Sequence, residues 1–487
     1  MADKKFIKAD YVSAIKDAQV AVECTLEASG DKPIVSVLAK EADAYCVSAE
    51  VMIGEANVTG RVNYKVAYVS GEGQVCALDY YSDFKTTVDI DVSPDTRLFV
   101  FGKVVEVEEI RKSDTAILLR AIVELSLIGV CKRDYVGAVE EGVHKKCETV
   151  KESTLKEIAE GSFVIDGEYE TGGRVDDVVL LDTSLVLKEG KAGRDSILVS
   201  GVAIANVTYN SDKGLTTKSI SLPFCEELSS LSATPGDDIY LYGYPKDARI
   251  ILSGDEENTT LRVEVTVALR CPVFTIADTE VLSDCYSCDK NLDVSVKEGE
   301  TYVKTGEWSF DERVSGATIL PDEAEGVARV ITVVLAKNDV SSVKSMEDVI
   351  NIEGTVLATV IYEDMSGVIR SMPVEVPYGI TERCEGSKDI GESYLRSAIA
   401  EVTAVGKRAR EIEVICLVKF YAYQCTREKF NYVSDIVDGG EEITRDALSI
   451  YMRGDGEDDW DIAKALKIPV QDIIGGERYV VCYHPIV

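Results

Sequence analysis

The chain has 487 residues, of which 46% are hydrophobic and 28% are charged, and its formal net charge is -34. This composition is typical of a folded globular protein, and at roughly 100–200 residues per domain it predicts three or four domains. The acidic excess argues against nucleic acid or an anionic membrane as a partner, because no basic surplus is present to pair with phosphates. It favours a partner with a basic patch.

Residues 1–20 contain lysines but lack the apolar stretch and the small-residue cleavage site of a signal peptide. The longest apolar runs, such as ITVVLA at 331–336, are far shorter than the ~20 residues of a membrane helix. The 13 cysteines are scattered along the chain, as is typical of reduced thiols in a cytosolic protein. We therefore expect a cytosolic protein with no membrane insertion.

Three segments share the spacing Gly-x7-Tyr-x4-Gly. Its residues are Gly60, Tyr68 and Gly73, then Gly201, Tyr209 and Gly214, then Gly354, Tyr362 and Gly367. An aromatic residue follows each segment ten or eleven positions later, namely Phe84, Phe224 and Tyr378. The stretch from glycine to tyrosine is rich in Val, Ile, Thr and Ala, which favours a strand, and the polar residues after it favour a turn whose glycine has positive φ. The spacing predicts a repeated hairpin, with these nine residues as determinants of the fold.

A long β segment follows each hairpin. The three segments are 119–131, 261–271 and 412–425. In the middle one, apolar residues from Leu261 to Leu269 alternate with polar ones, which predicts a strand with one buried face. We expect a mainly β protein of three tandem copies, each a β-sandwich or small β-barrel. The predicted copies are 1–148, 149–295 and 296–434.

Helical periodicity is scarce before residue 430. Leu155 and Ile158 share one face of a helix predicted at 150–161, which would link the first and second copies. The segment 297–306 is expected to join the second copy to the third in the same way.

Cys285 and Cys288 form a CxxC motif in the sequence DCYSC. Two interpretations stay open: structural thiols, or a metal or redox site, which here lacks a second cysteine pair at zinc-site spacing. The two histidines of the chain, His144 and His484, fall in different modules, so a Ser-His-Asp or Cys-His system is not expected. No nucleotide-binding loop is found either. We expect neither enzymatic activity nor a cofactor.

The last part of the chain predicts an acidic linker at 435–446 and a small βααβ module at 447–487. Its elements are a strand at 450–452, helices at 460–466 and 468–474, and a strand at 478–487. So small a unit buries little surface, so its stability should be marginal unless it docks on something.

This module resembles a LysM module. The residues that match the LysM turn and its Ile-Ala-Lys helix are Gly456, Trp460, Ile462, Ala463 and Lys464. The resemblance implies two loops that hold N-acetylated glycan chains. In the first loop the usual Asp, Ser/Thr and Leu are replaced by Glu457, Asp458 and Asp459, and the second is shortened to GGER. These departures argue against glycan and for a protein ligand.

Three hairpin copies followed by a LysM-like module resemble the SPOCS-domain proteins of spore-forming Firmicutes. The resemblance implies a non-enzymatic structural protein of spore coat morphogenesis, made in the mother-cell cytoplasm and located at the forespore surface. It also implies that the LysM end docks on the morphogenetic ATPase of the coat basement layer. Self-assembly into a homo-oligomer or polymer through sheet edges is a variant of this hypothesis. The alternative is a protein that binds peptidoglycan or cortex glycan through LysM.

Six residues of the module form the predicted partner interface. They are Trp460, Ile462, Lys464, Lys467, Asp458 and Asp459. The two aspartates have two compatible interpretations, because one of them can cap the following helix while the cluster attracts a basic partner. Trp460 is likewise either the core of the small module or an anchor in its interface.

Overall fold

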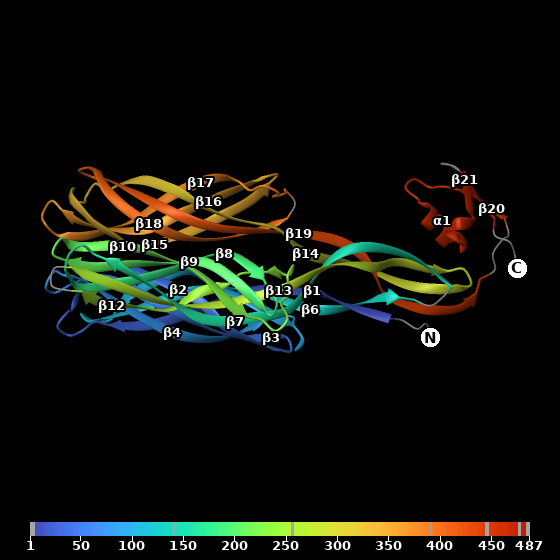
Figure 1. Cartoon of the computed structure of the whole chain (residues 1–487), viewed down its shortest axis with the longest axis horizontal. Helices are drawn as coiled ribbons and strands as arrows, with labels where there is room; N and C mark the ends of the chain where they lie inside the picture. The colour runs from blue at the N-terminus through green and yellow to red at the C-terminus, as the bar shows by residue number, and fades with distance from the viewer. Residues whose placement is uncertain are drawn as a thin grey trace.

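The computed structural model describes residues 5–139, 142–254, 258–389, 391–443, 448–475 and 479–483, and most of them lie in β-strands. They form an elongated body, a narrower stalk that projects from one end of the body, and a small terminal module beside the tip of the stalk (Figure 1). The mainly β fold predicted from the sequence is confirmed. No helix that the structure describes is long and apolar enough to cross a membrane.

Three consecutive stretches of chain fold with the same strand order, and we call them the first, second and third units. In each, the first, fifth and sixth strands build one antiparallel sheet, and the second, third and fourth build the other. The first unit comprises β1 (Lys5–Glu27), β2 (Ile34–Met52), β3 (Glu55–Ser70), β4 (Val75–Asp89), β5 (Arg97–Arg111) and β6 (Ala116–Ala138).

In the second unit the strand in fifth position is split into β11 and β12, which both pair with the last strand. Its strands are β7 (Val143–Glu170), β8 (Val175–Ala192), β9 (Ser196–Ser211), β10 (Gly214–Ser229), β11 (Asp238–Ile239), β12 (Gly243–Gly254) and β13 (Thr259–Ser287). The third unit comprises β14 (Lys290–Ile319), β15 (Val327–Met346), β16 (Val349–Asp364), β17 (Ile369–Arg383), β18 (Glu392–Arg408) and β19 (Glu411–Glu442).

The glycine–tyrosine–glycine spacing marks the same hairpin in each unit. The first glycine lies opposite the following aromatic residue in the pairs Gly60–Phe84, Gly201–Phe224 and Gly354–Tyr378. A Cβ on Gly354 would lie 2.5 Å from the Tyr378 hydroxyl oxygen and 2.7 Å from the Asp339 carbonyl oxygen. The aromatic ring and the neighbouring strand therefore occupy the space of a side chain. The turn glycines have the positive φ that the hairpin prediction requires: +78° at Gly73, +97° at Gly214 and +82° at Gly367.

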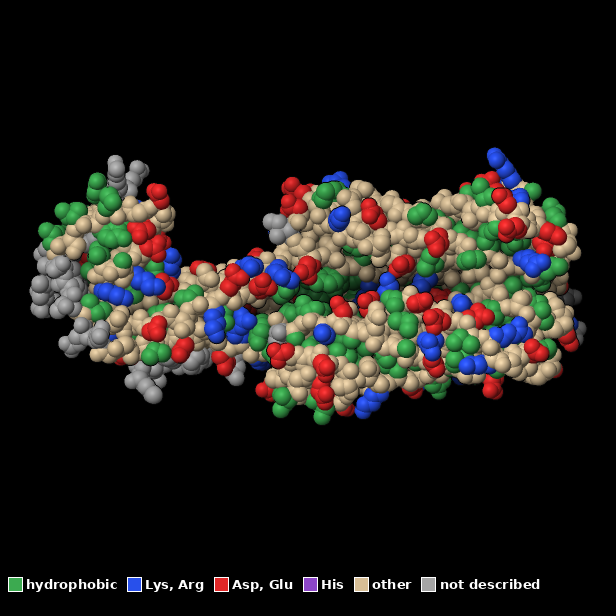
Figure 2. Space-filling view, turned by 180° about the vertical axis from the view of Figure 1, so that it is seen from behind, with side chains coloured by type: hydrophobic (Ala, Val, Ile, Leu, Met, Phe, Trp, Pro, Cys, Tyr) green, Lys and Arg blue, Asp and Glu red, His purple; other side chains and the backbone are tan. Residues whose placement is uncertain are grey.

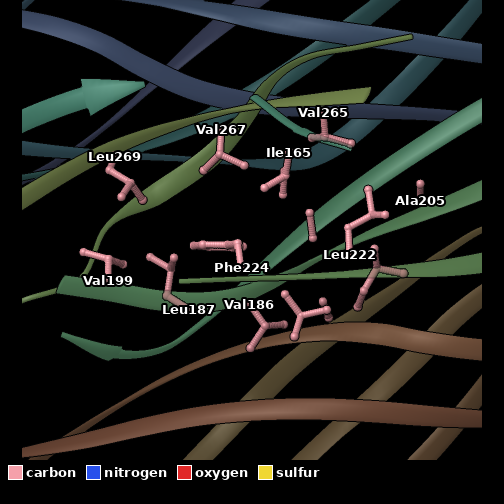
Figure 3. Packing of buried hydrophobic residues seen from close by; sticks show 14 of the residues in the cluster. Ile165, Val186, Leu187, Val199, Ala205, Leu222, Phe224, Val265, Val267 and Leu269 are labelled. Atoms are coloured by element: carbon pink, nitrogen blue, oxygen red, sulfur yellow. The ribbon is translucent and has the colours of Figure 1, made fainter. Parts of the chain in front are cut away.

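The core of each unit lies between its two sheets. In the second unit Leu261, Val263, Val265 and Val267 are 0% exposed, as the alternating pattern of this strand predicts. Figure 3 shows Val265 and Val267 packed in one cluster with Phe224 of the facing sheet.

The three units also pack on one another. A smaller apolar cluster joins equivalent strands of the three units, with Leu38 from β2, Leu180 from β8 and Val334 from β15, each no more than 7% exposed. The body is therefore one packed assembly and not a flexible string of domains.

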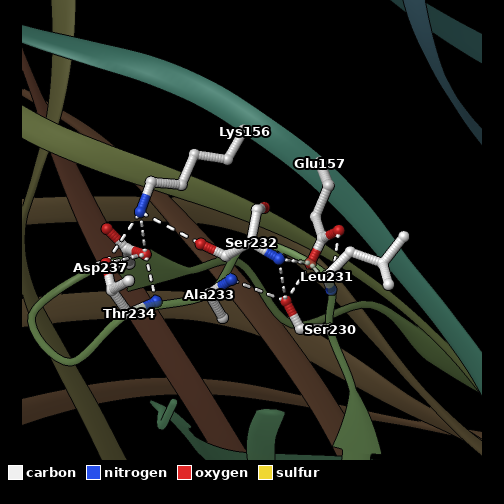
Figure 4. A network of polar contacts seen from close by, with 8 residues as sticks. All are labelled: Lys156, Glu157, Ser230, Leu231, Ser232, Ala233, Thr234 and Asp237. Carbon is white, nitrogen blue, oxygen red and sulfur yellow. Dashed lines mark hydrogen bonds and ion pairs between the residues drawn. The ribbon is translucent and has the colours of Figure 1, made fainter. Parts of the chain in front are cut away.

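The helix predicted at 150–161 is wrong, because this segment belongs to strand β7. β7 pairs with β13, and a bulge at Lys156 interrupts the register between Leu155 and Glu157. A bulge adds one residue to the strand, so residues on either side of it that share a face are three positions apart and not two. Leu155 and Ile158 have this spacing, which resembles that of a helix. Lys156 and Glu157 both hold the loop at 230–237, through hydrogen bonds to Asp237 and to Leu231 among others (Figure 4).

The stalk consists of the outer ends of three antiparallel strand pairs, each formed by the first and last strands of one unit. They pair 5–12 with 130–138, 143–153 with 276–287, and 290–303 with 426–442. Val136, Leu282 and Val433, one from each strand pair, meet in its apolar centre and are at most 2% exposed.

Two joining segments predicted from the sequence are in fact strands of this stalk. The segment 297–306 lies inside β14, and residues 435–442 of the predicted linker lie in β19. The predictions were wrong because Val433 and Ile436 are buried against strands that are distant in sequence, which the local acidic composition does not reveal. Residues 444–447 lie outside the described residues.

The terminal module contains β20 (Leu448–Met452), α1 (Asp459–Leu466), β21 (Ile473–Gly475) and β22 (Tyr479–Tyr483), with sheet order β20-β22-β21. The first predicted strand and the first predicted helix are found. The second predicted helix is wrong: only a 3-10 turn, Val470–Asp472, forms, because Pro469 is extended before it and Ile473 enters β21 after it. His484 lies outside the described residues.

We expect Gly354→Ala to lower the free energy of unfolding of the third unit by about 1–3 kcal/mol, because the new Cβ would overlap the Asp339 carbonyl. Gly379→Ala is the matched control on the facing strand, since its Cβ would meet no atom within 4 Å and should change stability by no more than about 0.5 kcal/mol. Calorimetric unfolding of both variants measures the difference. Equal destabilisation by the two substitutions would contradict the role given to Gly354.

Candidate functional site

The terminal module packs on the tip of the stalk around Tyr286, which lies near the end of β13 and is 1% exposed. Its ring stacks on His144 at 4.9 Å between centroids and meets the Trp460 ring edge-on at 5.0 Å. Its hydroxyl donates a hydrogen bond to the Ile468 carbonyl at 2.7 Å. His144 is therefore half-buried in this contact.

Asp284 is the polar centre of the same contact. Trp460 Nε1 donates to Asp284 Oδ2 at 2.8 Å, and Lys464 Nζ lies 2.7 Å from Oδ1 and 2.8 Å from Oδ2. The Asp284 side chain is 19% exposed. One carboxylate thus accepts hydrogen bonds from an indole and an ammonium group, and the charge on both Asp284 and Lys464 strengthens the second interaction.

Asp458 begins α1 and also contacts the stalk. Its carboxylate accepts a hydrogen bond from the Asp461 backbone N–H at 2.9 Å, and its own backbone N–H donates to the Asp461 carboxylate at 3.1 Å. This is a capping box. Lys146 of β7 pairs with Asp458 at 3.0 Å. The backbone hydrogen bond from Asp461 and the contact with Lys146 lower the pKa of Asp458.

The predicted partner interface is therefore directed largely at the protein itself. The residues held by the stalk or by the core of the module are Trp460, Ile462, Lys464 and Asp458. Asp459 is exposed and pairs with Arg453 of the same module. Lys467 ends α1 in the left-handed conformation, with φ 53°.

The stalk side of this contact, formed by Asp284, Tyr286 and Lys146, was not predicted from the sequence. A signal was present, because alternate residues of DCYSC point to one face of a strand, and Asp284 and Tyr286 share that face. Their contact partners could not be predicted from the local sequence, because Trp460 lies 176 residues after Asp284 in the chain.

Cys285 and Cys288 are not brought together as a metal site. Cys285 belongs to the apolar centre of the stalk, whereas Cys288 packs with the terminal module. Burial raises the pKa of the Cys285 thiol to about 11, and a protonated thiol is a poor metal ligand or nucleophile. Among the described residues, neither cysteine belongs to a close group of three or more potential metal ligands.

A second polar site lies where the three units meet, and we call it the charged junction. Lys65 Nζ lies 2.5 Å from Asp182 Oδ1, and Lys337 Nζ lies 2.9 Å from Asp43 Oδ1. These pairs link the first unit to the second and to the third. Burial would lower the pKa of Lys65, but its attraction to Asp182 outweighs this and raises it.

Glu41 is the remaining member of the charged junction. Its Oε2 atom is buried without a hydrogen-bond partner. Burial raises the pKa of Glu41 to about 8, and the neighbouring charges of Asp43 and Asp182 add to the effect. With Glu41 protonated, the positive charges of Lys65 and Lys337 equal the negative charges of Asp43 and Asp182.

The carboxylates of Glu41, Asp43 and Asp182 lie within 4.8 Å of one another, which is close enough to share a metal ion. However, the ammonium groups of Lys65 and Lys337 already contact two of them. The lysines supply the positive charge that a cation would bring, so the geometry supports a structural role in holding the units together.

Comparison with known families identifies the first unit. Residues 33–117 match the family model described as SipL, SPOCS domain. The match runs from the residue before β2 to the start of β6. The chain therefore contains a SipL-like SPOCS domain, which indicates association with sporulation and the spore coat. Comparisons with curated proteins and with solved structures give no match. The SPOCS resemblance seen in the sequence is confirmed for the first unit, and its extension to the other two units and the LysM resemblance stay predictions.

We expect Asp284→Ala to release the terminal module from the stalk, because the Trp460 indole and the Lys464 ammonium lose their shared acceptor. The loss should be about 1–3 kcal/mol, as for hydrogen bonds to a charged group. Hydrogen exchange of α1 and the Trp460 emission wavelength measure it. Asp284→Asn keeps an acceptor for the indole and should have a smaller effect, whereas Asp455→Ala on the exposed side of the module should have none. Unchanged exchange in Asp284→Ala would refute the docking role.

We expect the charged junction to weaken as pH rises. A glutamate in the unfolded chain loses its proton near pH 4.5, whereas Glu41 keeps it until about pH 8, so stability falls as pH rises between these values. Glu41→Gln should therefore melt a few degrees above the wild type at pH 9 and equally at pH 4. The exposed Glu72→Gln is the control. Thermal unfolding followed at both pH values checks the sign, and an advantage of Glu41→Gln confined to pH 4 would reverse it.

Proposed function

We propose that this protein is a non-enzymatic structural and adaptor protein of the spore coat. In this proposal the second and third units are further SPOCS-type repeats, and the terminal module is a LysM-like docking domain. The SPOCS match over residues 33–117 supports the association with the coat. The strand order common to the three units supports the repeats. By resemblance, the partner is the morphogenetic ATPase of the coat basement layer at the forespore surface.

The outer face of the module's sheet is the observation that carries the docking role. Every second residue of its strands points outward, away from α1. These residues are Leu448, Ile450, Met452, Ile474, Tyr479 and Val481, and they are between 39% and 75% exposed. Ile450 and Ile474 both pair with Val481, so their side chains form one row across the sheet. Figure 2 shows apolar side chains on the terminal module. We call this surface the outer module face.

An apolar face of this kind favours a protein partner. Monomeric proteins rarely expose contiguous apolar patches larger than a few hundred Å², and larger ones mark interaction sites. The side chains described on this face are aliphatic except for Tyr479, which is a poor match for a polar glycan. In addition, Trp460 and Asp458 in the first LysM loop contact the stalk, which supports a protein ligand over a sugar.

We expect the double substitution Ile450→Ser with Val481→Ser to weaken binding of the full-length chain to the basement-layer ATPase by at least about tenfold, or ~1.4 kcal/mol, because both residues lie at the centre of the outer module face. Biolayer interferometry with the purified ATPase measures the change. Leu231→Ser removes a side chain that is 94% exposed on the second unit and is the matched control, with no expected effect.

Two other outcomes would overturn the proposal. One is wild-type affinity in the double variant with an intact fold by circular dichroism. The other is sedimentation of the chain with purified peptidoglycan that disappears in Trp460→Ala, which would establish the glycan-binding alternative. Light scattering of the wild-type chain distinguishes an adaptor from the self-assembling variant, since a polymer grows with concentration in the absence of any partner.

A further inference from the structure

A cavity of about 420 Å³ lies where the three units meet. Equivalent places in the units supply its walls: Phe99 and Phe101 from β5, Tyr240 and Tyr242 from the segment after β11, and Tyr394 and Arg396 from β18. We call it the aromatic cavity. Its volume falls within the ~300–1,000 Å³ typical of small-molecule sites.

The aromatic walls are fixed by contacts among themselves. The Tyr240 ring meets Phe274 edge-on at 5.1 Å and Tyr423 at 5.6 Å, and Phe101 meets Tyr242 edge-on at 5.5 Å. The Phe101–Tyr242 contact joins the first unit to the second, and the Tyr240–Tyr423 contact joins the second to the third. A cavity whose rings hold one another is preorganised, so an occupant would lose little free energy in ordering it.

Arg396 is the unusual member of the lining. Its guanidinium lies over the Tyr242 ring at 4.9 Å from the centroid. Among the described residues it makes no hydrogen bond or ion pair, whereas Arg270, the other arginine of the lining, lies 2.8 Å from Glu160. The described lining contains no carboxylate. Arg396 is thus a half-buried arginine without an acidic partner among the described residues, in a chain with a net charge of -34.

The chemistry of this lining selects its occupant. A guanidinium has five N–H donors in a planar fork that matches a carboxylate, sulfonate or phosphate. The aromatic rings favour a flat apolar body. We propose that the aromatic cavity binds a small organic anion whose planar apolar part packs among the rings and whose charged group pairs with Arg396.

This site is independent of the adaptor function. Its lining comes from the three units, where the body meets the stalk, whereas the outer module face belongs to the terminal module, which lies beside the stalk tip in Figure 1. Because all three units line the cavity, an occupant would contact each of them and stabilise their arrangement by mass action.

The test compares two probes with the full-length chain. 8-Anilinonaphthalene-1-sulfonate has an aromatic body with one anionic group, and N-phenyl-1-naphthylamine has the same ring system without the sulfonate. Fluorescence titration should give about one saturable sulfonate-probe site per chain, with an affinity at least about tenfold above that of the neutral probe. Arg396→Gln should remove this advantage and leave binding of the neutral probe unchanged. The exposed Arg329→Gln is the matched control.

Two further variants locate the binding. Val130→Phe fills the cavity from β6 and should abolish binding of both probes while thermal unfolding shows a folded chain. Ile450→Ser removes part of the outer module face, where such dyes also adhere, and should leave the saturable site intact. Equal affinity for the two probes, an unchanged advantage in Arg396→Gln, or loss of the saturable site in Ile450→Ser would each overturn the proposal.

Discussion

Strand β13 pairs with β7 from Thr260 to Ser287, and this one ladder serves three parts of the molecule. Its first half buries Val263 and Val265 in the core of the second unit, its middle lines the aromatic cavity, and its end presents Asp284 and Tyr286 to the terminal module. At about 3.3 Å per residue the strand spans roughly 95 Å. Because side chains alternate with a period of two, a one-residue slip of this register would turn both the core and the docking residues to the wrong face.

Local patterns predicted the parts of the fold that local interactions determine. The glycine–aromatic pairs and the turn glycines follow from residues fewer than thirty positions apart, and α1 begins at its own capping aspartate. The helix predicted at 150–161 was wrong because the bulge at Lys156 changes the spacing of apolar residues while the segment remains a strand. The stalk and the charged junction were not predictable for another reason. Lys337 pairs with Asp43, which lies 294 residues away in the sequence. The local sequence around either residue contains no pattern that indicates this pairing.

In the terminal module, most of the residues predicted to contact a partner protein make contacts within the chain itself. Trp460 and Lys464 have the features of interface residues, an aromatic anchor and a basic side chain, and they do form an interface. It is an intramolecular one, on the stalk. A module this small buries little apolar surface in its own core. Docking on the stalk buries more of its surface and so stabilises it. The apolar surface that remains exposed is the outer module face, on the opposite side of the sheet. The sequence predicted two strands there but not their exposed apolar face.

The stalk also has a mechanical consequence. β19 leaves the body, runs to the tip and continues toward the terminal module, so tension on the module acts along the axis of this strand. The hydrogen bonds that hold β19 to β14 and β18 are perpendicular to that axis. A pull along β19 therefore applies a shear force to all of these hydrogen bonds at the same time. They do not open one after another, as they would if the strands were pulled apart from one end.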